Sequence, residues 1–261
     1  MAVSTDPILY TQLPSPLDVP INKLINFIDS VPNHNSALDE AKSTLKSSFA
    51  TYLKKRLPPD SSLSAIVGKS LVPISNTEVK KWTLMNTALL DSLAPECLFP
   101  LVDLWRLAIL DSTVASKVGT SVIRAIVQKL AALLASVSSP SDVSRPLMVT
   151  TLRLCANSHA HPTSTDSVIQ PEMKDILVSG LLHPDASVRT GAASLAFNVA
   201  SRRHTPFRTA DKAGTQTYNW GEVDRRGRND EGGQDVELIV ALLEAVDRET
   251  NEGVGSCPFE I

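Results

Sequence analysis

The sequence predicts an all-α fold in which helices pack on helices, and three observations support this prediction. Hydrophobic residues make up 43% of the 261 residues and charged residues 20%, which is typical of a globular chain. Glycine occurs only 11 times and aromatic residues make up 5%, so Leu and Ala carry most of the apolar content. That composition favours helices over sheets, which are richer in Val, Ile, Tyr and Phe. Finally, apolar residues recur at steps of three and four along most of the chain.

These steps predict the individual helices in chain order. The first apolar stripe comprises Ile21, Leu24, Ile25 and Ile28. Ser36 is a suitable N-cap for the second helix, which Pro58 ends. Further helices are expected over residues 61–69, 75–93, 99–110, 120–137, 142–157, 172–182 and 185–201, with another stripe from 236 to 243. We therefore expect about eight to ten helices with short connections and no strand.

One domain accounts for most of the chain. Residues 1–16 contain three prolines and no helical period, so we interpret them as an extended lead-in. Residues 17–250 form the predicted helical domain. Within it, residues 202–234 are polar, rich in Gly and Arg and without a period, which predicts a long flexible insertion. Residues 251–261 are expected to be an irregular tail.

Charge and cysteine content limit the classes of partner and the compartment. The formal net charge is −3, so no global positive field attracts nucleic acid. The three cysteines are odd in number and far apart, which favours a reducing compartment. The N-terminus lacks the pattern of a signal peptide. Charges interrupt the longest apolar stretches, so we expect that no segment qualifies as a membrane span. We therefore expect a cytoplasmic and/or nuclear monomer without a nucleic-acid or membrane partner.

No catalytic, metal or cofactor site is predicted. Cys155, His159 and His161 form a C-x3-H-x-H pattern, but zinc needs a fourth ligand and none is supplied nearby. We interpret them as a core cysteine and two loop histidines. Cys97 lies at a helix start, where the helix dipole could activate a thiolate, but a core cysteine is again favoured. Phosphate-binding loops, dinucleotide-binding glycine patterns and serine-nucleophile motifs are absent from the sequence.

Two arginines within apolar helices are the candidates for binding. A guanidinium at such a position requires either a partner or an exposed face. Arg106 follows Asp103 by three residues, so a simple ion pair within the helix is one alternative. Arg153 shares a helix face with Asn157, four residues later. The other alternative is a groove in which both arginines hold a carboxylate or phosphate.

Three further basic groups have simpler interpretations. Residues 54–56 (Lys-Lys-Arg) suit a helix C-terminus, where cations interact favourably with the dipole. Arg202-Arg203 and the group at 225–228 are interpreted as solvated charge, although the latter could bind an acidic surface or act as a nuclear address. These groups therefore predict no binding site of their own.

One segment resembles a helical-repeat motif. Residues 185–189 (Asp-Ala-Ser-Val-Arg), followed by Ala192, Ala193 and Leu195, look like the second helix of a HEAT or armadillo repeat. The sequence has no exact period, so degenerate repeats are implied. The predicted architecture is therefore an armadillo/HEAT-like stack of helices.

Three segments of the chain, in order, carry the pattern of a known domain family. Residues 98–107 (LFPLVDLWRL) fit an LFP-x-x-D-x-x-R-L segment. Residues 152–157 (LRLCAN) fit an LR-x-x-x-N segment, and residues 193–200 (ASLAFNVA) an LA-x-N helix. Together these segments resemble the PUL domain of phospholipase-A2-activating protein and its relatives, and the resemblance covers roughly residues 8–250. It implies a right-handed armadillo-like stack with a basic groove. In this family the groove binds the C-terminal tail of the valosin-containing-protein-type AAA-ATPase segregase, which links the domain to ubiquitin-dependent turnover.

The resemblance also implies roles for four residues. Arg106 and Arg153 would hold carboxylates of an extended peptide, while Asn157 and Asn198 would hold its backbone. Two alternative functions are compatible with the same sequence. One is an accessory or substrate-binding domain of a desumoylating or thioredoxin-like enzyme, as in similar fungal proteins. The other is a generic helical-repeat scaffold. The chain departs from the family pattern in its long insertion. The resemblance further leads us to expect a final helix with another arginine and an ALG segment after residues 244–252.

Overall fold

Helices make up almost all of the regular structure in the computed structural model. The structure describes residues 7–12, 16–32, 35–56, 73–159, 171–210 and 240–245, and no strand occurs within these ranges. The all-α prediction is therefore confirmed. The expected helix at 61–69, most of the expected insertion and the expected tail at 251–261 lie outside the described residues.

The helices follow one another in chain order with short connections. The first three helical segments are α1 (Asp18–Asp29), α2 (Ser36–Thr44) and α3 (Ala50–Arg56), with a π-helical turn, η1 (Leu45–Phe49), between the last two. They are followed by α4 (Asn76–Ser92), α5 (Phe99–Ala108), α6 (Ser112–Val114), a π-helical turn η4 (Ala115–Gly119), α7 (Thr120–Ser136), α8 (Arg145–Ser158), α9 (Pro171–Leu181) and α10 (Ala186–Ala210). Short 3-10 turns precede α5 at Pro95–Cys97 and α8 at Pro140–Asp142.

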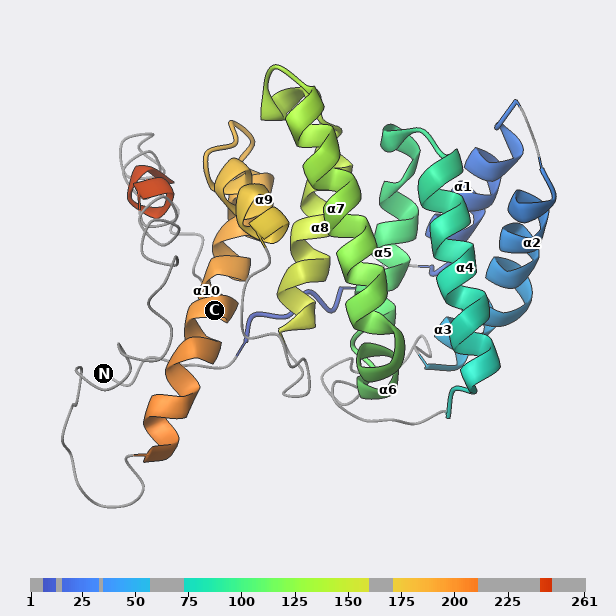
Figure 1. Cartoon of the computed structure of the whole chain (residues 1–261), viewed down its shortest axis with the longest axis horizontal. Helices are drawn as coiled ribbons and strands as arrows, with labels where there is room; N and C mark the ends of the chain where they lie inside the picture. Colours follow the sequence, from blue (N-terminus) through green and yellow to red (C-terminus); the bar gives the residue numbers. More distant parts are fainter. Residues whose placement is uncertain are drawn as a thin grey trace.

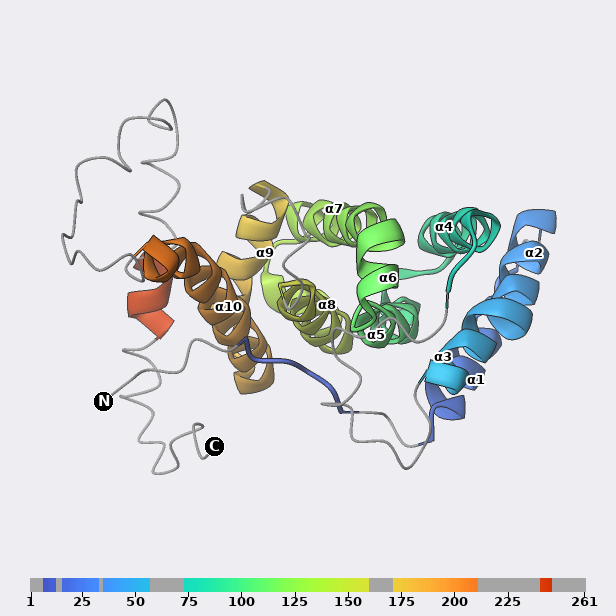
Figure 2. The ribbon, with the colours of Figure 1, turned by 90° about the horizontal axis from the view of Figure 1, so that it is seen from below.

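The helices are arranged in two layers, as Figure 2 shows from below. The inner layer contains α1, α5, α8 and α10, each in contact with the next. The outer layer contains α2, α4, α7 and α9, again with successive contacts, and Figure 1 shows the resulting row. This is the helical-repeat stack that the sequence predicts.

Side chains at the helix starts explain where several helices begin. The side chain of Asn35 accepts the backbone N–H of Leu38 at 2.9 Å, so Asn35 is the N-cap of α2, one residue before the predicted Ser36. Ser75 and Glu78 form a reciprocal capping box at the start of α4. Hydrogen bonds from the Ser75 backbone and side chain lower the pKa of Glu78.

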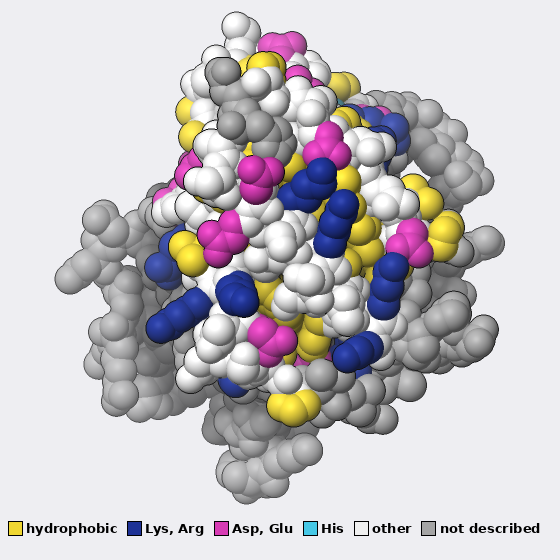
Figure 3. Space-filling view, turned by 90° about the vertical axis from the view of Figure 1, so that its right-hand side faces the viewer, with side chains coloured by type: hydrophobic (Ala, Val, Ile, Leu, Met, Phe, Trp, Pro, Cys, Tyr) yellow, Lys and Arg dark blue, Asp and Glu magenta, His cyan; other side chains and the backbone are white. Residues whose placement is uncertain are grey.

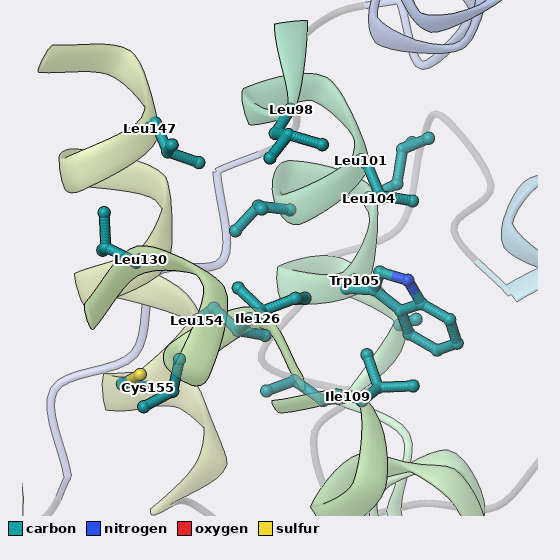
Figure 4. Packing of buried hydrophobic residues seen from close by; sticks show 14 of the residues in the cluster. Leu98, Leu101, Leu104, Trp105, Ile109, Ile126, Leu130, Leu147, Leu154 and Cys155 are labelled. Atoms are coloured by element: carbon teal, nitrogen blue, oxygen red, sulfur yellow. The ribbon is translucent and has the colours of Figure 1, made fainter. Parts of the chain in front are cut away.

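The core runs continuously between the two layers. Phe49, Trp82 and Trp105 meet at ring-centroid distances of 4.6–6.5 Å, which joins η1, α4 and α5. Figure 4 shows Ile126 and Leu130 of α7 packed among the apolar side chains of α5 and α8. This packing fixes the spacing of the inner-layer helices, on which the candidate site depends.

A buried ion pair ties the end of α3 to the start of α6. Nε of Arg56 lies 2.8 Å from Oδ2 of Asp111, and these side chains are 2% and 0% exposed. Tyr52 donates its hydroxyl proton to the same carboxylate at 2.7 Å, and burial raises the pKa of that phenol. Residues 54–56 lie in the last turn of α3, as the sequence indicated, and Arg56 in addition has a partner 55 residues away that fixes its position.

Two helices are longer than predicted. α10 continues to Ala210, nine residues into the expected insertion, because its earlier part is anchored on α8 and α9 and a helix already begun elongates at little further cost. Residues 112–136 form one helical stretch, although the sequence indicated a start at Thr120. By length and composition this stretch could cross a membrane, which corrects the expectation that no segment qualifies. In the structure α7 packs against α4, α8 and α9 as a member of the outer layer.

Candidate peptide-binding groove

An extended segment of the chain lies across the inner layer. Residues 7–12, which we call the N-terminal strap, have no regular secondary structure. Figure 2 shows the strap passing along α10, then α8, towards α5. The sequence predicted an extended lead-in here, and the structure shows that this lead-in is bound along the stack.

Two asparagines hold the backbone of the strap. Asn198 of α10 accepts the N–H of Ile8 at 2.7 Å and donates to its carbonyl at 2.8 Å. Asn157 of α8 does the same for Tyr10, at 2.7 Å and 3.0 Å. A carboxamide can donate and accept at once, so it pairs with a residue of an extended chain as a neighbouring strand would. Ile8 and Tyr10 are two residues apart, which matches the two-residue period of an extended peptide.

The same asparagines also connect neighbouring helices of the inner layer. Nδ2 of Asn157 donates to the carbonyl of Arg106 in α5 at 3.1 Å, and Nδ2 of Asn198 donates to the carbonyl of Ala156 in α8 at 3.0 Å. Both side chains are buried, at 0% and 1% exposed. The two positions are thus equivalent in successive repeats, an equivalence that the degenerate sequence conceals.

Arg106 of α5 also binds the backbone of the strap, and we call the row formed by Asn198, Asn157 and Arg106 the ladder. Nε of Arg106 donates to Oδ1 of Asp103 at 2.7 Å, and its guanidinium donates to the carbonyls of Tyr10 and, at 2.9 Å, Gln12. The ion pair within the helix, one of the two alternatives raised by the sequence, is therefore present. Arg106 is 4% exposed, and the carboxylate that it holds belongs to its own helix.

Arg153 has different surroundings from Arg106. It is the one residue of α8 between Leu147 and Asn157 that is not buried. Its guanidinium carbon lies 4.9 Å from the ring centroid of Tyr10, a cation–π contact. Its Nε is buried without a hydrogen-bond partner, and within the part of the chain that the structure describes no carboxylate pairs with it. Among the described residues, Arg153 is thus a cation that lies beside the strap residue Tyr10 and pairs with no carboxylate.

The side chain of Tyr10 gives the strap a defined position. Its hydroxyl donates to Oγ of Ser194 at 2.7 Å, and Ser194 donates to the carbonyl of Thr190 at 2.9 Å. Sequence reasoning found neither Tyr10 nor Ser194. The available signal was the stretch between Pro7 and Pro14, Ile-Leu-Tyr-Thr-Gln-Leu, which is more apolar than a typical linker.

A cation and two aromatic rings lie on the neighbouring helices of the inner layer. Nζ of Lys23 in α1 lies 4.5 Å from the ring centroid of Phe99 in α5 and 5.9 Å from that of Phe27. The two rings meet edge to face at 6.3 Å. Phe99 precedes Asp103 by four residues, so it shares a face of α5 with the residues beside the strap. The sequence analysis did not single out this cluster, because its members come from two helices.

The thiols lack the features of catalytic cysteines. Burial raises the pKa of Cys155 to about 12, and burial together with the charge of Glu96 raises that of Cys97. Neither thiol is therefore activated at neutral pH. No group of three metal-binding side chains occurs among the described residues, and His161 and Cys257 lie outside them.

Surface charge on the α1–α4 end of the stack is mixed. Figure 3 shows Lys and Arg side chains interspersed with Asp and Glu and with small apolar areas on that face. Lys54 pairs with Asp18 there, and Lys42 with Asp29. This face therefore lacks the continuous positive surface typical of nucleic-acid binding.

Comparison with known proteins agrees with this geometry. Searches of curated proteins and of solved structures each gave no significant match. A sequence model of the PUL domain, in contrast, matches residues 4–254, which include the strap and the inner-layer helices that hold it. The chain therefore belongs to the PUL domain family, a family of protein-interaction domains.

Proposed function

We propose that this domain is an adaptor that binds the C-terminal tail of a valosin-containing-protein-type AAA-ATPase segregase. The observation that supports the proposal is the ladder formed by Asn198, Asn157 and Arg106, which holds an extended peptide by its backbone. With that partner, the domain would act as a monomer in ubiquitin-dependent turnover, in the cytoplasm and/or the nucleus.

Arg153 is the residue best suited to hold a carboxylate of the tail. Its guanidinium lies over the ring of Tyr10 and its Nε has no hydrogen-bond partner, whereas Arg106 already pairs with the carboxylate of Asp103. The helix packing excludes water from one side of Arg153, which strengthens an ion pair between its guanidinium and a carboxylate of the tail. Asn157 and Asn198 remain the groups suited to peptide backbone. For a short peptide, the affinity is expected to be roughly micromolar.

The cluster of Lys23, Phe27 and Phe99 suits an aromatic or apolar residue flanked by acidic ones. Its rings are half-buried, so a further ring could stack against them without first displacing a core side chain. Lys23 adds a further cation on the inner layer. An acidic tail with an aromatic residue would therefore find cations and aromatic rings both on α1 and α5 and at Arg153 of α8.

Capture of the segregase from native extract tests the proposal. The full chain is used as bait, together with Arg153→Glu and Arg124→Glu, which makes the same charge change on an exposed residue of outer-layer α7. The wild type and Arg124→Glu should retain the segregase, and Arg153→Glu should lose it while keeping a native helical spectrum. Equal capture by all three would mean that Arg153 does not hold the tail.

The two alternative functions make different predictions. An accessory role in thiol or desumoylating chemistry requires a reactive cysteine, and burial opposes this for Cys97 and Cys155. A generic helical scaffold shares the fold but predicts no retention of the segregase by any of the baits. The capture experiment therefore also separates the adaptor from the scaffold.

A further inference from the structure

The strap already occupies the ladder that would hold a partner's backbone. We propose that residues 8–12 are a displaceable internal ligand, and that the surface beneath them binds an extended partner segment with the same pattern. That pattern is an extended backbone with an aromatic residue at the position of Tyr10. This proposal concerns the ladder and does not depend on the identity of the segregase.

Most of the bonds to the strap use groups that any extended peptide presents. Asn198, Asn157 and Arg106 contact only backbone N–H and carbonyl groups of residues 8, 10 and 12. Side-chain selectivity comes from one position, where Tyr10 meets Ser194 and Arg153. A segment from another chain can therefore satisfy the same bonds if it carries an aromatic residue there.

Exchange is favoured over simple opening of the strap. Asn157 and Asn198 are almost completely buried, and their Oδ1 atoms accept the strap's amide protons. If the strap left and only water replaced it, the net stabilisation of about 0.5–1.5 kcal/mol for each of these hydrogen bonds would be lost. A competing extended peptide restores the same bonds, so the ladder favours one strand or another over none.

The strap is also only moderately anchored by apolar burial. Ile8, Leu9, Tyr10 and Thr11 are half-buried, and none of residues 7–12 is fully buried. Its main advantage over a separate peptide is the tether to α1, which gives an effective concentration on the order of 1 mM. A free peptide whose affinity for the open ladder is on the order of 100 µM would therefore bind about tenfold more weakly to the wild type.

Proline substitutions in the full chain can weaken the strap without altering any helix. Ile8→Pro/Tyr10→Pro removes both amide donors to the asparagines. Leu9→Pro is the matched control, because it introduces proline between them at a position whose N–H makes no such bond. Tyr10→Ala, which removes only the ring, is a milder second variant. The probe is a labelled peptide with the sequence of residues 6–14, Asp-Pro-Ile-Leu-Tyr-Thr-Gln-Leu-Pro, followed by fluorescence anisotropy.

The double proline variant should bind the probe about tenfold more tightly than the wild type, and Leu9→Pro should resemble the wild type. Tyr10→Ala should lie between them. A probe with Ala in place of its tyrosine should bind more weakly to the double variant. Equal affinities of wild type and double variant, or no binding to a natively folded double variant, would overturn the proposal. Binding of the segregase tail is measured in parallel on the wild type, so a failure there counts only against the proposed function.

Discussion

Two groove arginines that look alike in the sequence have different roles in the structure. The spacing of Asp103 and Arg106 predicted their ion pair correctly, because three residues bring two side chains together on a helix. The contacts of Arg106, Asn157 and Asn198 with the strap could not be predicted. They join residues 94 to 190 positions apart, and no local pattern encodes such pairs. The available cation, Arg153, likewise became distinguishable only through its surroundings.

Replacing Asp111 with Asn should be the most destabilising change among the ionisable side chains discussed here. The substitution leaves Arg56, 2% exposed, without its buried carboxylate, which costs about 3–5 kcal/mol. Asp18→Asn is the control, since its pair with Lys54 is about half exposed, and exposed pairs contribute about 1 kcal/mol or less. Urea unfolding measures both. Similar losses of unfolding free energy in the two variants would show that the buried pair contributes no more to stability than the exposed pair.

Buried His183 should make stability depend on pH. Burial lowers its pKa below the usual 6.5, more than the charge of Asp185 raises it, and the charges of Arg189 and Arg145 lower it further. The unfolded chain therefore binds the proton more readily. The free energy of unfolding should be highest above pH 6.5 and fall as the pH drops towards the folded pKa. His183→Asn should reduce that slope in urea unfolding between pH 7 and 5. An unchanged slope would assign the dependence to other groups.

Thiol labelling of the native protein tests the absence of an activated cysteine. Cys155 is 0% exposed and its pKa is about 12, so its alkylation at pH 8 should be far slower than in urea. Cys97 is half-buried and its pKa is also raised, so it should react more slowly than a free thiol. Rapid stoichiometric labelling of either residue in the folded protein would revive the thiol-enzyme alternative.

The helices themselves were largely predictable, and the strap was not. Apolar steps of three and four located α1, α4, α5, α8 and α9 to within a few residues, because each buries one or more faces in the stack. The segment at 112–119 was missed because a π-helical turn interrupts the helical period there. The strap was interpreted as a lead-in because extended backbone held by side chains has no periodic signature.

Two glycines in the helices should respond oppositely to alanine. A Cβ at Gly180 of α9 would lie 3.0 Å from Cβ of Ala192 and 3.1 Å from Cδ1 of Leu152, so Gly180→Ala should destabilise by about 1–3 kcal/mol. At Gly119 the nearest atom would be 3.6 Å away, so Gly119→Ala should be neutral or stabilise by about 0.4–1 kcal/mol. Thermal unfolding of both variants is the measurement. A higher unfolding temperature for Gly180→Ala would mean that α9 and α10 can move apart without a loss of stability.

The whole molecule presents one layer of helices to an extended peptide. α5, α8 and α10 each contribute a residue to the ladder because they are equivalent members of a stack, and their spacing spreads those residues along the strap. The fold class and the four candidate residues came from sequence. What the structure adds is that three of these residues hydrogen-bond the backbone of the chain's own strap. Arg153 instead stacks on the ring of Tyr10 and, among the described residues, pairs with no carboxylate.

Titration calorimetry with a synthetic segregase tail peptide tests the adaptor proposal most directly. The wild type and Arg124→Glu should bind with a Kd that is roughly micromolar, and Arg153→Glu should bind at least about tenfold more weakly. Arg153→Gln, which removes the charge without reversing it, should lie between them, and helical spectra should show that all variants are folded. Absence of heat and of competition with the wild type at high peptide concentration, or equal binding by Arg153→Glu, would contradict tail binding at Arg153.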